Sequence, residues 1–409
     1  MTKELQGPTG ERPGRSTGRN LVVLCDGTGN ELGGALSVDT EDIRISNVLK
    51  LYRIAEKGKS QIVYYSAGVG TVGRVDFVYR WKQKFLGVLG LAMGYGLDAN
   101  VVGAYRFLAE NWQEGDNIYL FGFSRGAWTV RVLAGLIHLI GLVRPSQLNM
   151  CDNALATYKR AAREDKLPIA WHFARVIGSR FPTIHFVGVW DTVASVLVPR
   201  SDRMWVPSLE TLPYTRTNPS VRIFRHALAL DERRRMFRVA DWVQPQAYVA
   251  NRFHTDKVAE QDIEQRWFPG VHSDIGGGYP ERESALSKQP LIWMTNEAKR
   301  FGLRITDANL QKFAYGQGGG NEDHSYCKPD PRGRMHHSLT IGWKPLEIVP
   351  KRVTNREWPR RRSFLGFYLP LAEPRPVAPV HKIDATVKMR CDAGIGYEPE
   401  NFHPNDSQG

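Results

Sequence analysis

The sequence predicts an α/β fold in which a mostly parallel central sheet is flanked by helices. Apolar runs of the length of short strands alternate along the chain with longer segments whose apolar residues have helical spacing. Several of these strands are apolar at nearly every position, as expected of strands that are buried on both faces. Polar residues follow their carboxyl ends, and this is the edge where open α/β sheets form their sites.

The first part of the chain contains two predicted strands and two predicted helices. Residues 1–20 are rich in Gly, Pro, Thr and Arg, so this tail is expected to be disordered. A continuous apolar run predicts a first strand at 21–25, a second short strand is predicted at 61–65, and a helix over 39–56 lies between them. Apolar residues at helical spacing predict a further helix over 97–112.

The same alternation continues through the middle of the chain. The expected elements are a strand at 117–121, a buried helix at 127–142, strands at 183–190 and 266–271, and a helix at 291–301. Together these elements predict a catalytic domain over residues 21–310.

Three segments do not fit simple connections between strands and helices. Residues 142–181 and 202–265 are too long for ordinary loops and are predicted to be insertions that form a cap or lid. Beyond residue 310 the alternation weakens and the chain becomes rich in Pro and Arg. Residues 311–409 are therefore expected to form an irregular extension packed on the core.

The charge of the chain bears on its partners. It has 55 Lys and Arg against 42 Asp and Glu, a net charge of +13, which favours peripheral contact with anionic membranes or simply a basic, soluble surface. Phe77–Leu86 mixes aromatic residues with cations, as interfacial segments and packing helices both do. The arginine runs 233–235 and 360–362 are typical of solvated faces or of phosphate recognition. Specific recognition of nucleic acid is not expected.

Other compositional features exclude several classes of protein. No cleavable signal and no apolar stretch long enough to span a bilayer is found, so a cytoplasmic protein is expected, with signal-independent secretion left open. The four cysteines lie far apart, so no disulfide framework is expected. His324, Cys327, His336 and His337 fit no structural zinc spacing, so no metal is expected.

The most informative motif is Gly122-Phe123-Ser124-Arg125-Gly126, which lies between a predicted strand and a predicted helix. This is the context of the nucleophile elbow of α/β-hydrolases, in which a strained turn exposes the serine hydroxyl and small residues avoid collisions across the turn. An N-cap role for Ser124 is the structural alternative. The Arg125 amide is an oxyanion-hole candidate, and the loop at Asp26 and Gly27 is a candidate for the second donor.

A serine nucleophile needs a general base and an acid that orients it, and α/β-hydrolases place them in the order Ser, Asp or Glu, His. Asp191 and His272 follow predicted strands in this order. They are therefore the predicted acid and base. Asp274 is an alternative acid, and Asp26 is a further rival for that role.

Five motifs in a fixed order make the chain recognisable. They are Leu24-Cys25-Asp26-Gly27-Thr28-Gly29-Asn30, Leu120-Phe121-Gly122-Phe123-Ser124-Arg125-Gly126-Ala127, Trp190-Asp191-Thr192-Val193-Ala194-Ser195, Ala229-Leu230-Asp231-Glu232-Arg233-Arg234, and Trp267-Phe268-Pro269-Gly270-Val271-His272-Ser273-Asp274-Ile275-Gly276-Gly277-Gly278-Tyr279. Over roughly Leu21 to Leu303 the chain resembles the uncharacterised α/β-hydrolase domain family that includes phospholipase effectors of the bacterial type VI secretion system. The resemblance implies an α/β-hydrolase-like core, a Ser–Asp–His triad and ester hydrolysis, often of phospholipids. An effector role does not follow, because many members of the family are stand-alone proteins.

The sequence thus predicts a serine esterase that needs no cofactor and acts on carboxylic esters, with phospholipids as the leading substrate class. Two alternatives stay open. The first is a hydrolase of soluble esters or amides. The second is a non-catalytic basic module that binds anionic membranes or nucleic acid.

Overall fold

The computed structural model describes residues 18–27, 44–68, 97–193, 197–199, 207–209, 212–250, 258–317, 326–340, 343–353, 357–358 and 362–402. Nearly all of the predicted N-terminal tail lies outside these residues, as do Phe77–Leu86 and most of the arginine run 360–362.

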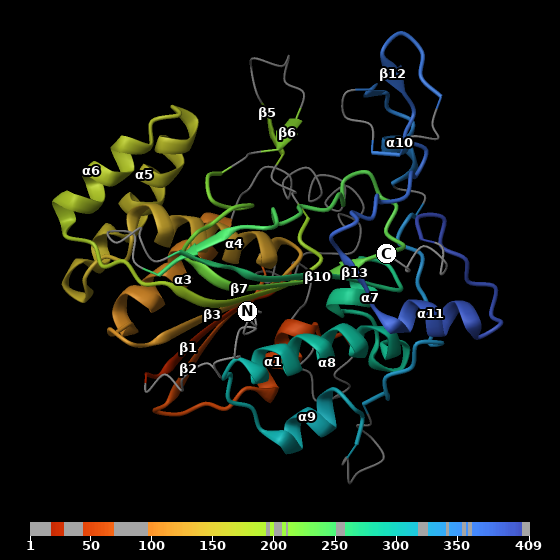
Figure 1. Ribbon diagram of the computed structural model, residues 1–409, viewed down its shortest axis with the longest axis horizontal. Helices are drawn as coiled ribbons and strands as arrows, with labels where there is room; N and C mark the ends of the chain where they lie inside the picture. Colours follow the sequence, from red (N-terminus) through yellow and green to blue (C-terminus); the bar gives the residue numbers. More distant parts are fainter. Residues whose placement is uncertain are drawn as a thin grey trace, which may run out of the picture.

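A parallel sheet of seven strands forms the centre of the described structure, in the order β13-β10-β7-β4-β3-β1-β2 (Figure 1). Its strands are β1 (Asn20–Cys25), β2 (Gln61–Ser66), β3 (Asn117–Phe123), β4 (Ile184–Trp190), β7 (Val221–Ala229), β10 (Asp262–Phe268) and β13 (Lys382–Ile383). The predicted fold class is confirmed, and every pair of neighbouring strands in this sheet is parallel.

Helices cover both faces of the sheet (Figure 1). One face packs against α3 (Leu97–Asn111), α4 (Arg125–Ile140), α5 (Cys151–Arg163) and α6 (Leu167–Ile177). The other face packs against α1 (Asn47–Ile54), α8 (Ala285–Arg300) and α9 (Asp307–Phe313). Among the described helices, none combines the length and the apolar character needed to cross a bilayer.

The apolar run of β1 follows from burial on both faces. Leu21 and Val23 belong to the core on the α4 side, whereas Val22 and Leu24 belong to the core on the α1 side, and all four side chains are fully buried. Burial of each such side chain contributes about 1.5–3 kcal/mol. β1 is therefore an inner strand, between β3 and β2, and the loop after Cys25 leaves it at the carboxyl edge of the sheet.

Strand β7 was not predicted, and it lies inside the segment 202–265 that the sequence suggested as an insertion. Its apolar pattern is interrupted by Arg225 and His226, which are both buried. Arg225 forms ion pairs with Glu297 at 2.7 Å and Asp262 at 2.8 Å. These partners are distant in sequence, so the strand is stabilised by tertiary contacts that its own residues do not reveal.

Several element boundaries differ from the predictions. Helix α1 begins at Asn47 because the Ser46 side chain accepts a hydrogen bond from the Leu49 amide at 3.1 Å and caps the helix. The extension beyond residue 310 contributes β13 to the sheet, and also includes α10 (Lys344–Glu347), β11 (Lys351–Arg352), β12 (Phe367–Tyr368) and α11 (Ala385–Asp392).

Candidate active site

Ser124 lies in a strained turn between β3 and α4, with φ 56° and ψ −117°. The turn requires glycine on both sides: a Cβ on Gly122 would lie 2.4 Å from the carbonyl oxygen of Gly126, and a Cβ on Gly126 would lie 2.0 Å from that of Cys25. The Ser124 side chain makes no capping hydrogen bond to α4. The turn therefore has the geometry of a nucleophile elbow. The Ser124 side chain does not act as the N-cap of α4.

Gly126→Ala is expected to displace this elbow, because α4 must move away from Cys25 to accommodate the new Cβ. Overpacking of this kind lowers the free energy of unfolding by about 1–3 kcal/mol. A 1 Å displacement of Ser124 would slow its reaction with a fluorophosphonate about a hundredfold. Thermal unfolding and labelling rates measure the two effects. Gly58→Ala is the control, since nothing lies within 4 Å of its added Cβ; equal behaviour of the two variants would contradict the packing constraint.

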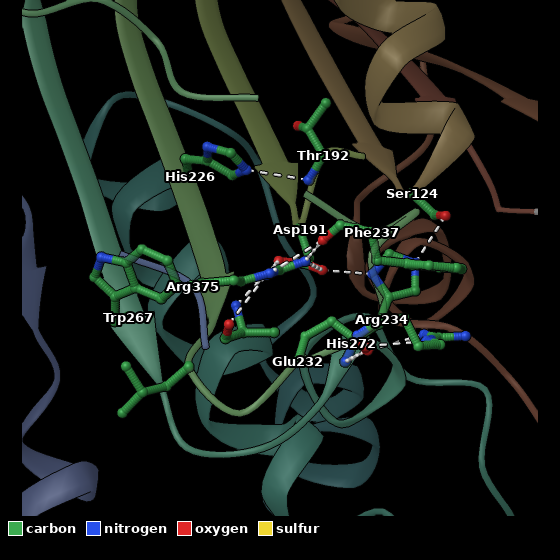
Figure 2. A network of polar contacts seen from close by, with 12 residues as sticks. Ser124, Asp191, Thr192, His226, Glu232, Arg234, Phe237, Trp267, His272 and Arg375 are labelled. Atoms are coloured by element: carbon green, nitrogen blue, oxygen red, sulfur yellow. Dashed lines mark hydrogen bonds and ion pairs between the residues drawn. The ribbon is translucent and has the colours of Figure 1, made fainter. Parts of the chain in front are cut away.

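His272 is the first residue of α7 (His272–Gly276), directly after β10 and its turn. Its Nε2 lies 2.8 Å from Ser124 Oγ, and its Nδ1 lies 2.5 Å from Asp191 Oδ2. The imidazole is buried between the rings of Phe123 and Phe237, with centroid distances of 4.7 Å and 4.9 Å. The structure thus brings together Ser124, His272 and Asp191, the three side chains that the sequence predicts to act together (Figure 2).

Asp191 follows β4 and is fully buried. Its Oδ1 accepts a hydrogen bond from the Ala229 amide at 3.0 Å, and its two oxygens also contact Arg375 at 2.6 Å and 3.1 Å. The alternative acid Asp274 is turned elsewhere: its carboxylate bonds to His336 Nδ1 at 2.7 Å and to the Val271 amide at 3.0 Å. Of Asp191 and Asp274, Asp191 is the one whose carboxylate contacts the His272 imidazole.

Burial and neighbouring charges act on both members of this pair. Burial lowers the pKa of His272 below its usual range, although Asp191 opposes this effect, so the imidazole is neutral at neutral pH and able to accept a proton. Burial by itself would raise the pKa of Asp191, but Arg375 and His272 together lower it far below its usual range. The pair therefore consists of a neutral imidazole and a carboxylate.

Residues of the Ala229–Arg234 motif support the turn that carries His272. Glu232 accepts a hydrogen bond from the His272 amide at 3.2 Å and pairs with Arg234 through two contacts of 2.9 Å. Burial would raise the pKa of Glu232, but Arg234 holds it at about 2, so the side chain stays ionised. Asp231 accepts from the Gly270 amide at 2.6 Å. In the family pattern this motif has no assigned role, and its contacts show that it supports the turn before His272.

The loop after β1 lies beside Ser124, since a Cβ on Gly27 would be 3.4 Å from Ser124 Cβ. The Asp26 amide donates to the Ser66 carbonyl at 2.9 Å, and the Gly27 amide donates to the Asp26 carboxylate at 2.6 Å. That carboxylate also accepts from Ser46 at 2.5 Å and from Tyr65 at 2.8 Å, so Asp26 anchors the loop and is not an acid partner of His272.

Arg125 is the first residue of α4, where helical amides have no partner within the helix, so its amide is the better placed oxyanion-hole candidate. Its side chain is buried, and within the described residues its Nη2 has no hydrogen-bond partner. Burial lowers the pKa of this guanidinium to about 10, so it remains a cation at neutral pH. Further along α4, Arg131 is also buried but donates to the carbonyls of Thr215 and Ala240 at 2.7 Å and 2.5 Å.

The described residues contain no group of three His, Cys, Asp or Glu side chains arranged to bind a metal ion. Of the four residues considered as ligands, His324 lies outside the described residues, and His336 contacts Asp274 and Glu283.

Comparison with known proteins places this chain in a family. A family model described as "T6SS, Phospholipase effector Tle1-like, catalytic domain" matches residues 19–297, which is more than half of the chain. The uncharacterized protein YEL023C of Saccharomyces cerevisiae is 33% identical over 423 residues, covering 73% of this chain and 59% of that protein. The chain thus spans less than two thirds of the length of this relative.

Two solved structures are similar at a lower level. An uncharacterized protein from Pseudomonas aeruginosa has a TM-score of 0.36 and 17% identity, over 71% of this chain and 46% of that one. The Tle1 effector bound to the VgrG spike of the type 6 secretion system has a TM-score of 0.32 and 19% identity, over 67% and 54%. Both TM-scores are below 0.5, so the assignment rests on the sequence match. By that match the chain belongs to the family of Tle1-like phospholipase effector catalytic domains.

Proposed function

We propose that this protein hydrolyses carboxylic esters of phospholipids through an acyl-enzyme formed on Ser124. Ser124 Oγ attacks the acyl carbonyl while His272 Nε2 takes its proton, and His272 then protonates the leaving alkoxide as the ester C–O bond breaks. Water attacks the acyl-enzyme with His272 again as the base, and the fatty acid leaves as the proton returns to Ser124. Asp191 orients His272, and no cofactor takes part.

The observation that carries this proposal is the pair of contacts made by His272, at 2.8 Å to Ser124 Oγ and 2.5 Å to Asp191 Oδ2. These are within the range over which a proton can pass. The Arg125 amide at the start of α4 is the first proposed oxyanion donor. The Gly27 amide is the second, provided that it leaves the Asp26 carboxylate when substrate binds. Each such donor is worth about 2.7–4 kcal/mol in the transition state.

The buried cation of Arg125 favours a phospholipid over a neutral soluble ester. Within the described residues Arg125 Nη2 has no hydrogen-bond partner, which is unfavourable for a buried cation, and an anionic substrate group would supply one. In a phospholipid, the phosphate lies a few bonds from the ester carbonyl. Arg125 directly follows Ser124 in the sequence, so a carbonyl at Ser124 would bring a phosphate into this part of the site. The net charge of +13 and the family's description as phospholipase effectors support the same substrate class.

The C-terminal extension provides a surface suited to a lipid interface. Phe364 and Leu365 are 79% and 82% exposed at the turn that leads into β12, and Arg362 beside them is exposed as well. Figure 1 shows β12 near the end of a projecting arm. Exposed apolar side chains next to cations are typical of segments that contact anionic membranes from one side. We propose that this arm contributes to peripheral membrane contact.

The test compares two substrates and one substitution. We expect wild-type protein to react with a fluorophosphonate, to release fatty acid from phospholipid vesicles, and to cleave a short neutral ester more slowly. Arg125→Met removes the cation but keeps the amide, so the rate on phospholipid should fall by about 10- to 100-fold relative to the rate on the neutral ester, the value of a charged hydrogen bond. Fatty-acid release and ester cleavage, measured in parallel, give this ratio.

Arg131→Lys is the matched control, because Arg131 is a buried arginine of the same helix whose donors are already occupied by backbone carbonyls. Its ratio of the two rates should equal that of wild type. Equal loss of both activities in Arg125→Met would exclude a phosphate contact. Reaction with the fluorophosphonate and with the soluble ester, but not with vesicles, would favour the alternative hydrolase of soluble esters.

A further inference from the structure

Arg375 reaches the candidate active site from the C-terminal extension, far along the chain from the other members. Its Nη1 lies 2.6 Å from Asp191 Oδ1 and its Nη2 lies 3.1 Å from Asp191 Oδ2, so the guanidinium grips both carboxylate oxygens. Both side chains are only 1% exposed. A two-pronged contact of this kind fixes the plane of a carboxylate as well as its position.

The remaining donors of Arg375 are also occupied. Nη1 donates to the Ala229 carbonyl at 3.0 Å, and Nε donates to the Phe237 carbonyl at 3.1 Å. The backbone of the same residue is fixed by Asn401, whose side chain bonds to the carbonyls of Arg375 and Leu230 at 2.9 Å and 3.0 Å. The guanidinium is therefore held against Asp191 by contacts with the end of β7 and with the loop that follows it.

These contacts determine which oxygen of the Asp191 carboxylate His272 can contact. Oδ1 is occupied by Arg375 and by the Ala229 amide, and Oδ2 is shared between Arg375 and His272 Nδ1. A carboxylate accepts only, so Nδ1 must carry the imidazole proton, and Nε2 is then the unprotonated nitrogen that faces Ser124. Figure 2 shows Ser124, His272, Asp191 and Arg375 connected in this order.

We infer that Arg375 is a positioning residue of the proposed triad, contributed by the C-terminal extension, which fixes the Asp191 carboxylate in the orientation that His272 requires. The inference rests on the proposed function of Ser124, His272 and Asp191. It makes residues beyond the matched family region part of the working site, since that region ends at residue 297.

The positive charge of Arg375 also sets the pH at which the pair of His272 and Asp191 takes up a proton. A cation beside the pair disfavours the added proton on either group, so removing it raises the apparent pKa of the pair, whichever group carries the proton. Other charged or titratable groups face the pair from β7 and the following loop. They are Arg234, which lowers the pKa of His272, Glu232, which raises it, and His226, which burial keeps neutral.

The experiment measures the rate of fluorophosphonate labelling against pH for wild type, Arg375→Lys and Arg375→Met. In Arg375→Met we expect the acid side of the profile to move up by about 1–3 pH units, the usual effect of a cation on a neighbouring carboxyl. Labelling at neutral pH should fall, but by less than the roughly 10⁴-fold loss expected when the acid itself is replaced. Arg375→Lys keeps the positive charge but cannot contact both Asp191 oxygens in the same way. The acid side of its pH profile should therefore move less than that of Arg375→Met.

A second comparison separates positioning from general stabilisation. In an Asp191→Asn background, Arg375→Met should cause no further loss of labelling, because Arg375 acts through the carboxylate. Arg131→Lys is the matched buried arginine and should have the wild-type profile. Thermal unfolding shows which variants fold. If Arg375→Met does not fold, the pH profile of Arg375→Lys tests the inference instead.

The outcomes for Arg375 and for the triad are distinguishable. If wild type is not labelled, the proposed function is wrong and the inference falls with it. If wild type is labelled, but folded Arg375→Lys and Arg375→Met keep its pH profile and lose rate equally at every pH, only the inference is wrong. Equal losses from Arg375→Met with and without the Asp191 carboxylate would overturn it in the same way.

Discussion

Ser124→Ala is expected to abolish fluorophosphonate labelling and to reduce ester hydrolysis by about 10⁴-fold or more, since the acyl-enzyme cannot form without the hydroxyl. Because the Ser124 side chain contacts His272 and caps nothing, its removal should leave the fold intact. The unfolding temperature is therefore expected to stay close to that of wild type. Mass spectrometry of the labelled protein and release of fatty acid from vesicles measure the loss.

Ser287→Ala is the matched control for this substitution. Ser287 is also buried, but its hydroxyl donates to the Ser284 carbonyl at 2.9 Å, far along the chain from the elbow. The Ser287→Ala variant should be labelled at the same rate as wild type. Full hydrolytic activity in Ser124→Ala would exclude the proposed nucleophile. If no hydrolysis is found in wild type while binding to anionic vesicles weakens steeply with salt, the non-catalytic alternative is favoured.

The parts of the fold that the sequence predicted are those with strong local signals. Strands β1 to β4 and β10 are apolar runs that end at polar residues, and each was predicted within a few residues. Ser124 is the candidate nucleophile because an elbow needs glycine at two fixed positions, and an added Cβ at either glycine would lie less than 2.5 Å from a backbone carbonyl oxygen. His272 followed from its place after a strand.

The parts that were missed depend on contacts between distant residues. Strand β7 contains Arg225 and His226, which are buried there beside partners distant in sequence, among them Glu297, Asp262 and Thr192. Arg375 stands in an irregular segment with no periodic pattern, and nothing near it in sequence suggests a buried ion pair. The roles of such residues depend on contacts that form only when the chain has folded. Local sequence patterns therefore cannot predict these roles.

The candidate acids of the triad are Asp191, Asp274 and Asp26, and the Asp26 carboxylate is bonded to Gly27, Ser46 and Tyr65. Substitution discriminates between the other two. Asp191→Asn is expected to slow labelling of Ser124 by about 10⁴-fold, because an amide can donate to Nδ1 and so favours the tautomer in which Nε2 carries the proton. Asp274→Asn should cause a much smaller loss, since the Asp274 carboxylate contacts His336 and a backbone amide. The reverse order of the two losses would make Asp274 the acid.

Asp191→Asn should also destabilise the protein, and this second effect is separable from the first. The substitution leaves Arg375 buried beside an amide, and loss of one partner of a buried ion pair costs about 3–5 kcal/mol. Adding Arg375→Met removes the unpaired charge, so part of the free energy of unfolding should return, whereas labelling should stay at the level of Asp191→Asn alone. Denaturant unfolding and labelling rates on the same samples measure both quantities. If activity returned together with stability, Asp191 would contribute to the fold and not to the reaction.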